Sequence, residues 1–389
     1  MSFSLVRGQD KAVEILKDEI KNGRISHAYL FSGQSGLGKK KLALEFAKAV
    51  FCSKKELDSC DSCISCRKVD HSNHPDLKII VRAEDKSAIS IDQIRKLKKE
   101  IAYKPYESER KIYIIEDADL MTKEAANSLL KTLEEPPEFA TIILLAEDAG
   151  KLLPTIVSRC QEVKLTDVSS ELIEDILLKK NLPQDKAEVL SCLAEGSPGR
   201  AVKFAENESF FDERKNIYNF IADIEEKTTV EIFLAADQFN KLINNDFPFF
   251  YLLSNWYRDI IMIKQNYEQG VRNIDYLDLI KKNTDKYTEK DIMDRLEYIE
   301  QKKIGLDEDE LTSKADGYSY KKMLCVCFDL AILVNYNDKR FFEFAYHDGS
   351  FESMSDTKKI RYLNSIRNIC DKYDIQYILT ALEDDIPRT

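Results

Sequence analysis

Apolar residues in the first 166 positions alternate between helical spacing and short continuous runs. The segment 6–22 carries Val13, Leu16 and Ile20 at the three- and four-residue intervals of a helix, and the apolar run 28–31 follows it. Helical spacing returns at 41–51, 89–101 and 123–133, and strand-like runs return at 77–81, 111–115 and 141–145. This alternation predicts an α/β domain with a parallel sheet covered on both faces.

The strand signal nearly ends after residue 166. Segments 169–207 and 210–301 have helical patterns and predict a small and a larger helical domain. The predicted fold class is therefore α/β followed by α, with domains at 1–166, 167–207 and 208–302. A tail at 303–389, where strand-like runs return, completes the chain.

A glycine-rich loop, GQSGLGKK, lies at 33–40 between the first predicted strand and a helix. This context is the one in which a phosphate-binding loop is found, and the candidate binding residues are Gly33, Gly36, Gly38 and Lys39. A working loop continues with Ser or Thr, whose hydroxyl binds Mg²⁺, but this chain has Lys40 there. The pattern predicts a nucleotide-binding fold that has lost hydrolysis and works inside an assembly. Whether ATP still binds stays open, and Mg²⁺ is not expected.

The strand 112–115 ends in Glu116 and Asp117. A catalytic strand of this kind ends in an acid that orients Mg²⁺, followed by an acid that activates water. Here the usual Asp-Glu order is reversed, which favours a degraded site. Two carboxylates at a strand end that still hold a metal are the alternative.

Four of the nine cysteines cluster just after the predicted helix 41–51, with the spacing C-x7-C-x2-C-x2-C. They are Cys52, Cys60, Cys63 and Cys66. Four thiolates are the usual complement of a closed structural zinc site, which leaves no position for a catalytic water. His71 and His74 lie close by, but a full set of cysteines makes them surplus, and we expect them to be loop histidines.

The net charge of −11 disfavours a protein that coats nucleic acid by itself. The N-terminus has no apolar signal-peptide core, and no stretch reaches 18 uninterrupted apolar residues. These properties predict a soluble, cytoplasmic protein without a membrane partner.

With these residues placed, about the first 300 positions resemble the delta-prime subunits of bacterial DNA polymerase III clamp loaders, which are AAA+ proteins. The matching stretches include GRISHAYLFSGQSGLGKKKLA, the four-cysteine module, HPD at 74–76, and IYIIEDADLMTKEAANSLLKTLEEPPEFATIILLAED. The resemblance implies an AAA+ domain, a helical lid and a collar that joins five subunits into a ring. Partners would be delta and gamma/tau subunits, and through the complex the sliding clamp and primed DNA.

The resemblance also assigns roles by position. Ser158-Arg159-Cys160 matches the family's SRC motif, so Arg159 would act as an arginine finger on a neighbouring subunit's ATP. This places the motif after the last core strand, at the subunit edge; the alternative is an ordinary surface arginine. Arg200 matches the sensor-2 position, and beside a silent phosphate loop we expect it to hold the lid domain.

The tail instead resembles the C-terminal end of an SMC-like ABC-type ATPase head. Residues 317–321 would be a degenerate signature loop and 344–348 its Walker B strand, but the tail has no phosphate loop of its own. We predict that 342–346 and 376–379 form adjacent parallel strands linked by a helix at 358–372. The alternative is a helix and strand that pack on the collar.

Three functions follow from these patterns. The leading one is a non-hydrolysing clamp-loader subunit of the DNA polymerase III holoenzyme, acting in DNA replication. The second is an active, gamma/tau-like ATPase motor of the same loader, which also carries four cysteines and SRC. Lys40 and the Glu116-Asp117 order count against it. The third is an SMC-like, ATPase-related protein defined by the tail, against which the missing second phosphate loop counts.

Overall fold

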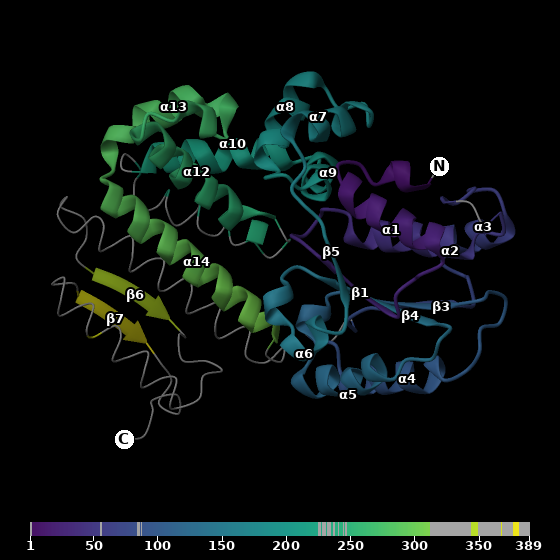
Figure 1. Cartoon of the computed structure of the whole chain (residues 1–389). Coiled ribbons are helices and arrows are strands. Elements are labelled where there is room, and N and C mark those ends of the chain that lie inside the picture. Colours follow the sequence, from purple (N-terminus) through teal and green to yellow (C-terminus); the bar gives the residue numbers. More distant parts are fainter. Residues whose placement is uncertain are drawn as a thin grey trace, which may run out of the picture. The chain divides into compact units, whose positions relative to one another are not determined.

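The chain is represented by a computed structural model that describes residues 2–311, apart from 55–56, 84–85, 87 and scattered positions between 225 and 246. Beyond residue 311 it describes 344–348, 367 and 376–380. Two compact units make up the chain (Figure 1). The first comprises Met1–Tyr218 with Tyr267–Leu279, and the second Asn219–Asn266 with Ile280–Thr389.

The first unit contains a five-stranded parallel sheet with the strand order β2-β3-β4-β1-β5. The strands are β1 (Ala28–Ser32), β2 (Leu77–Ile80), β3 (Lys111–Ile115), β4 (Ala140–Ala146) and β5 (Gln161–Lys164). The prediction of a parallel sheet is confirmed. The apolar pattern did not indicate β5, a polar edge strand in which only Val163 is buried and which pairs with β1.

Helices cover both faces of this sheet (Figure 1). On one face, α1 (Asp10–Asn22) and α2 (Lys39–Phe51) pack on β-strand side chains such as Phe31. On the other face, α4 (Ile91–Ile101) and α5 (Lys123–Glu134) pack on residues that include Leu30. The predicted fold class, an α/β domain with a parallel sheet covered on both faces and a helical part after it, is confirmed.

Two helices begin later than their apolar patterns predict. The first was expected from residue 6, but residues 2–5 form a 3₁₀ helix, η1 (Ser2–Leu5), and α1 begins at Asp10. Gly8 has φ +78°, and a Cβ there would lie 2.9 Å from the Val168 side chain, so the chain turns at this glycine. Helix α4 begins at Ile91 because Ser90 and Gln93 form a capping box.

Short elements connect the layers of the first unit. They are α3 (Ile64–Asp70), η2 (Ala118–Leu120), η3 (Ala149–Lys151), α6 (Pro154–Val157) and η5 (Glu268–Gly270). The segment that follows β5 is helical, with α7 (Ser170–Leu178), α8 (Gln184–Leu193), α9 (Pro198–Glu206) and α10 (Phe210–Ala222). Arg214 of α10 is buried between the Tyr218 and Tyr276 rings and donates to Asp275 at 2.7 Å. This contact joins α10 to η6 (Ile274–Tyr276).

The second unit contains α12 (Phe249–Lys264) and α14 (Glu289–Leu311), which pack against each other. The segment 274–301, part of the predicted larger helical domain, is divided into η6, α13 (Leu277–Asn283), η7 (Thr284–Lys286) and the start of α14. The expected domain boundary at residue 302 falls inside α14. Among the described residues, no helix is long and apolar enough to cross a membrane.

Two strands are described in the tail, β6 (Phe344–Asp348) and β7 (Gln376–Thr380). They pair in parallel, with Phe344 opposite Gln376, which confirms the predicted pairing. The predicted signature-like loop at 317–321 lies outside the described residues. So does the predicted helix at 358–372, apart from residue 367, which is helical.

Candidate nucleotide and metal sites

The phosphate loop runs from the end of β1 to the start of α2. Its backbone turns at Gly33 and Gly36, which have φ of 143° and 79°. A Cβ on Gly36 would lie 2.2 Å from the Ser197 hydroxyl, so only glycine fits between the loop and α9. At Gly38, before the first turn of α2, a Cβ would meet nothing within 4 Å. The loop therefore has glycine-dependent turns between a strand and a helix, the setting in which phosphate-binding loops occur.

The two lysines that end the loop are both held by protein groups. Lys39 donates from Nζ to the carbonyl of Gly33 and, at 3.0 Å, to that of Gln34. Burial lowers the pKa of Lys39. Nζ of Lys40 lies 2.8 Å from Oε1 of Glu116, as an ion pair without hydrogen-bond alignment. The residue in place of the Mg²⁺-binding hydroxyl thus neutralises the first acid of the strand-end pair.

The loops at the carboxyl ends of β3 and β4 are tied to each other. Oδ2 of Asp119 accepts from the backbone N–H groups of Glu147 and Asp148, at 3.2 and 3.5 Å. Asp117 has φ +49°, a left-handed conformation. The strand-end carboxylates therefore lie at one edge of the sheet, beside the phosphate loop, because parallel strands end at the same edge.

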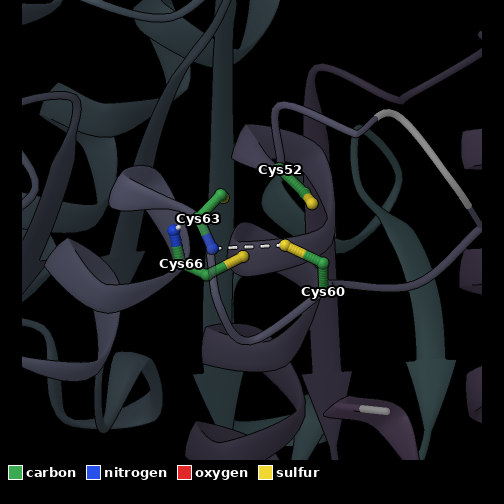
Figure 2. A group of neighbouring side chains, drawn as sticks. All are labelled: Cys52, Cys60, Cys63 and Cys66. Atoms are coloured by element: carbon green, nitrogen blue, oxygen red, sulfur yellow. Dashed lines mark hydrogen bonds between the residues drawn. The ribbon is translucent and has the colours of Figure 1, made fainter.

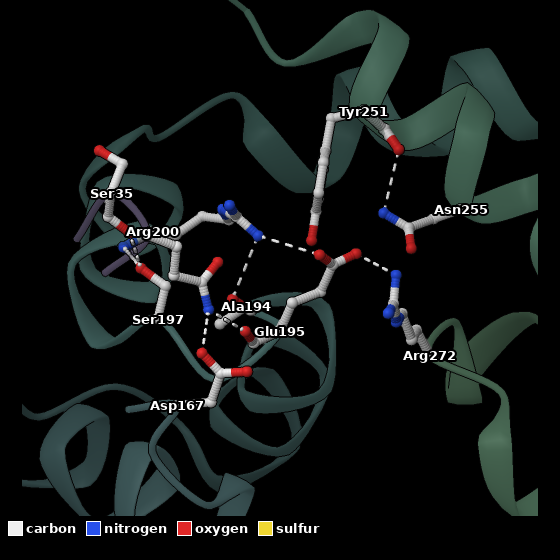
Figure 3. Close-up of polar contacts among 10 residues, drawn as sticks. Ser35, Asp167, Ala194, Glu195, Ser197, Arg200, Tyr251, Asn255 and Arg272 are labelled. Atoms are coloured by element: carbon white, nitrogen blue, oxygen red, sulfur yellow. Dashed lines mark hydrogen bonds and ion pairs between the residues drawn. The ribbon is translucent and has the colours of Figure 1, made fainter. Parts of the chain in front are cut away.

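The phosphate loop is fastened to the start of α9 (Figure 3). Ser197 donates from Oγ to the carbonyl of Ser35 at 2.8 Å, and the N–H of Gly199 donates to the carbonyl of Gly36 at 2.9 Å. The Gln34 amide adds a bond of 2.6 Å to Asp167. These bonds hold the helical segment after β5 against the loop.

Arg200 points to an acid of its own helical segment (Figure 3). Its Nη1 lies 3.3 Å from Oε2 of Glu195 and 3.4 Å from the carbonyl of Ala194. Glu195 also accepts from Arg272. This sequence-predicted residue is thus part of a network that braces the segment.

The four predicted cysteines come together at the end of α2 and the start of α3 (Figure 2). Their Sγ atoms all lie within 4.8 Å of one another. A tetrahedral zinc with bonds of about 2.3 Å places its sulfurs about 3.8 Å apart. Sγ of Cys60 accepts from the N–H of Cys63, and Sγ of Cys63 accepts from the N–H of Cys66, at 3.3 and 3.4 Å. The cluster fits one metal ion.

The thiols of the cluster differ in acidity. Hydrogen bonds from Ser62 lower the pKa of Cys60 to about 5. Burial raises the pKa of Cys63, but backbone hydrogen bonds from Cys66 and Ser53 outweigh it and bring it to about 7. Burial raises the pKa of Cys52 and of Cys66. A bound cation would attract all four sulfurs. It would therefore stabilise the thiolate forms of Cys52 and Cys66, which burial alone disfavours.

Lys48, which the sequence analysis did not single out, anchors this cluster to α2. Its side chain is 4% exposed, and Nζ lies 2.8 Å from both Asp61 and Asp70 and 3.4 Å from Glu45. Asp61 lies in the cysteine turn between Cys60 and Cys63, and Asp70 is the last residue of α3. The only signal for this role in the sequence is a lysine inside an apolar helical stretch, Ala47–Val50 being otherwise non-polar.

The HPD stretch also has a structural role. His74 is buried, stacks on Phe51 at 4.2 Å, and accepts at Nδ1 from the N–H of Asp76. Asp76 in turn accepts from three consecutive backbone N–H groups, at 106–108. His71, by contrast, caps the exposed end of α3. His74 lies in a loop, as expected, and in addition packs against Phe51.

Arg159 lies directly after α6, and its side chain is 35% exposed. Its Nη2 lies 2.9 Å from Oε1 of Glu134, and Nη1 donates to the carbonyl of Thr155 at 2.9 Å. The SRC motif was expected after the last core strand, but β5 follows it. The expectation was wrong because the polar pattern of β5 concealed a strand. Burial raises the pKa of Cys160 to about 12.

Two family models match different parts of the chain. The model described as "DNA polymerase III, delta subunit" matches residues 8–169. The model described as "Uncharacterised protein conserved in bacteria (DUF2326)" matches residues 279–389. The second match coincides with the tail and with α14. The likeness of the tail to an SMC-like head stays a prediction.

Whole-chain comparisons point to subunits of one polymerase. The chain is 32% identical to DNA polymerase III subunit delta' of Bacillus subtilis over 292 residues, 74% of this chain and 88% of the relative. It is 32% identical to DNA polymerase III subunit tau/gamma of Haemophilus influenzae over 251 residues, but covers 36% of that protein. A solved gamma subunit-related protein of Thermotoga maritima has 21% identity, covers 73% of this chain and 97% of that one, and gives a TM-score of 0.39.

The delta' match extends well beyond the phosphate loop and the cysteines. It includes nearly the whole length of that relative at 32% identity. The chain therefore belongs to the family of the delta' subunits of DNA polymerase III.

Proposed function

We propose that this chain is a clamp-loader subunit of DNA polymerase III that does not hydrolyse ATP itself and that supplies Arg159 to the ATP of a neighbouring subunit. The observation that carries the proposal is the ion pair between Lys40 and Glu116. Hydrolysis requires a Mg²⁺ held by the loop hydroxyl and a strand-end acid. Here an ammonium replaces the hydroxyl and uses the acid as its own partner.

The remaining loop residues, Gly33, Gly36, Gly38 and Lys39, form a degenerate nucleotide site in this proposal. The bonds from Ser197 and Gly199 connect that site to the lid at 167–207. Arg200 holds the lid through Glu195 and does not sense nucleotide. Mg²⁺ has no role in this subunit.

We assign a structural Zn²⁺ to the four cysteines Cys52, Cys60, Cys63 and Cys66. When bound, the ion would supply the cross-links that a short cysteine-rich insertion cannot gain from packing. Four sulfur ligands leave no open position, so the site takes no part in the reaction.

Arg159 is suited to act on another subunit. It follows α6 near the domain surface, and its guanidinium is partly exposed. A planar guanidinium stabilises charge on a transferring phosphoryl group with bidentate geometry, which a lysine does not reproduce. The proposed partners are delta and gamma/tau subunits in a five-membered ring, and through the ring the sliding clamp and primed DNA.

The test is an Arg159→Ala variant in a loader reconstituted with its delta and gamma/tau partners. Assembly of the ring is checked first, and DNA-stimulated ATP hydrolysis is measured second. We expect intact assembly and a loss of hydrolysis on the order of 10³-fold at the ATP site that faces this subunit. Unchanged hydrolysis in an assembled ring would refute the proposal.

A second candidate is an active gamma/tau-like motor, favoured by the tau/gamma relatives of 30–35% identity. The two candidates differ in the isolated chain. ATP turnover by the parent chain that disappears in Lys39→Ala would identify a motor. Turnover at background in both the parent and Lys39→Ala would support the non-hydrolysing subunit. A third candidate, an ATPase-related function defined by the tail, is favoured by the second family match at 279–389.

A further inference from the structure

The guanidinium of Arg159 is held from two directions by its own domain. Nη2 lies 2.9 Å from Oε1 of Glu134, the last residue of α5. Nη1 donates to the carbonyl of Thr155 in α6 at 2.9 Å, with the Ser158 hydroxyl at 3.5 Å. The side chain is therefore oriented in this subunit before any neighbour is present.

We infer that Glu134 is a positioning residue for Arg159, setting the guanidinium for the phosphate of a nucleotide bound by a neighbouring subunit. The inference rests on the proposed function, because it assumes that Arg159 acts in trans. It adds a second residue, from a different helix, to the machinery of the neighbour's reaction.

The donor count supports this role. A guanidinium has five N–H donors; those on Nη1 donate to Thr155 and Ser158, while Nη2 forms an ion pair with Glu134. The group therefore has further donors for phosphate oxygens. The planar guanidinium can thus keep its contacts within this subunit and still bind an anion. A lysine ammonium, which is a point charge, cannot do both.

Anchoring also reduces the cost of docking the arginine. A free arginine side chain loses many rotamers when it is fixed at an interface, and a side chain that is already held loses fewer. The carboxylate of Glu134 partly offsets the positive charge. Its side chain is 46% exposed, however, so solvent screens that effect. Orientation therefore outweighs charge compensation at this position.

The experiment uses the full chain in the reconstituted loader, with ring assembly verified for every variant. Glu134→Ala removes the anchor, Glu134→Gln keeps an oxygen acceptor without the charge, and Glu135→Ala is the matched control at the next, exposed position. We expect Glu134→Ala to lower kcat for ATP at the facing site on the order of tenfold with KM unchanged, as for contacting residues that couple. Glu134→Gln restores most of the rate, and Glu135→Ala keeps all of it.

The decisive comparison adds Glu134→Ala to Arg159→Ala. If Glu134 acts through the arginine, the double variant has the same rate as Arg159→Ala alone. A further loss in the double variant would show a structural role and overturn the inference. An unchanged or faster rate in Glu134→Ala, together with a slow rate in Arg159→Ala, would also overturn the inference about Glu134. The proposal that Arg159 acts as an arginine finger would then still hold. An unaffected Arg159→Ala loader would overturn both proposals.

Discussion

At the residue scale, Lys40 decides the chemistry of the phosphate loop. The loop glycines keep their turns, and α2 begins directly after Gly38. In the proposed function the metal position is changed in two ways, by the Lys40 ammonium that lies on Glu116 and by the reversed Glu116-Asp117 order. The loop would thus keep its glycine turns but lack the metal chemistry that hydrolysis requires.

Lys40→Thr is expected to increase the affinity for Mg²⁺-ATP on the order of tenfold. The change removes a positive charge from the metal position, restores a hydroxyl ligand and releases Glu116. Hydrolysis stays at background because the Glu116-Asp117 order is unchanged. Binding of a fluorescent ATP analogue, with and without Mg²⁺, measures the effect. Lys41→Thr, at the next and exposed position, is the control. If ATP binding depends equally on Mg²⁺ in the parent, Lys40→Thr and Lys41→Thr, Lys40 does not block the metal position.

Lys48→Met is expected to lower the free energy of unfolding by about 3 kcal/mol, the cost of breaking a buried ion pair. Burial lowers the pKa of Lys48, but hydrogen bonds to Asp61 and Asp70 outweigh it and raise the pKa. Without the ammonium, the buried Glu45 loses a neighbouring cation. Urea unfolding measures the loss. Lys68→Met, which removes a surface pair with Glu107, should lower the free energy of unfolding by under about 1 kcal/mol. Equal losses of stability in the two variants would refute the role of Lys48 as a buried anchor.

At the scale of elements, the cysteine turn and α3 form an insertion between α2 and β2. Purified protein is expected to contain about one zinc per chain, because four thiolates form one closed site. Cys63→Ser removes a ligand, while a serine can still cap α3, so zinc content and melting temperature should both fall through loss of the metal. Cys192→Ser, on α8 outside the cluster, should change neither. Finding no metal in the purified parent protein, with Cys63→Ser as stable as the parent, would exclude the site.

The contact between α2 and the loop before β2 predicts acid sensitivity. Burial lowers the pKa of His74 below its usual 6.5. As pH falls through about 6.5, the unfolded chain binds a proton that the folded chain does not, so stability falls. His74→Asn removes this proton uptake, and its melting temperature should decline less between pH 7 and pH 5. The matched control His71→Asn, on the exposed end of α3, should decline like the parent. A parallel decline in all three would count against this role.

The sequence predicted those elements whose own residues carry the signal. Strands β3 and β4 are buried along their whole length, and their apolar runs identify them. Strand β5 has one buried position, so its pattern is that of a loop. The phosphate loop and the cysteines were found because their residues are neighbours in sequence. The partnership of Arg159 with Glu134 could not be found, because it depends on how α5 and α6 pack.

At the scale of the whole molecule, two family matches meet in one chain. The second match begins at residue 279 and includes α14, yet α14 packs on α12. Arg295 of α14 lies over the rings of Tyr257 and Tyr287 and donates to the Tyr257 hydroxyl at 3.3 Å. The first residues of the second family match therefore pack together with α12, a helix that precedes the match in sequence.

A chain ending at residue 311 is expected to keep the fold of its helical part, whereas a chain ending at residue 286 should lose it. The shorter chain lacks α14, whose Ile292 and Ile299 are buried. Loss of these two side chains alone removes about 3–6 kcal/mol of hydrophobic stabilisation, and loss of α14 exposes the face of α12 that α14 covers. Thermal unfolding and sedimentation compare both chains with the parent, and zinc content serves as an internal control for the first unit. Equal unfolding of the two shortened chains would show that α14 does not stabilise α12.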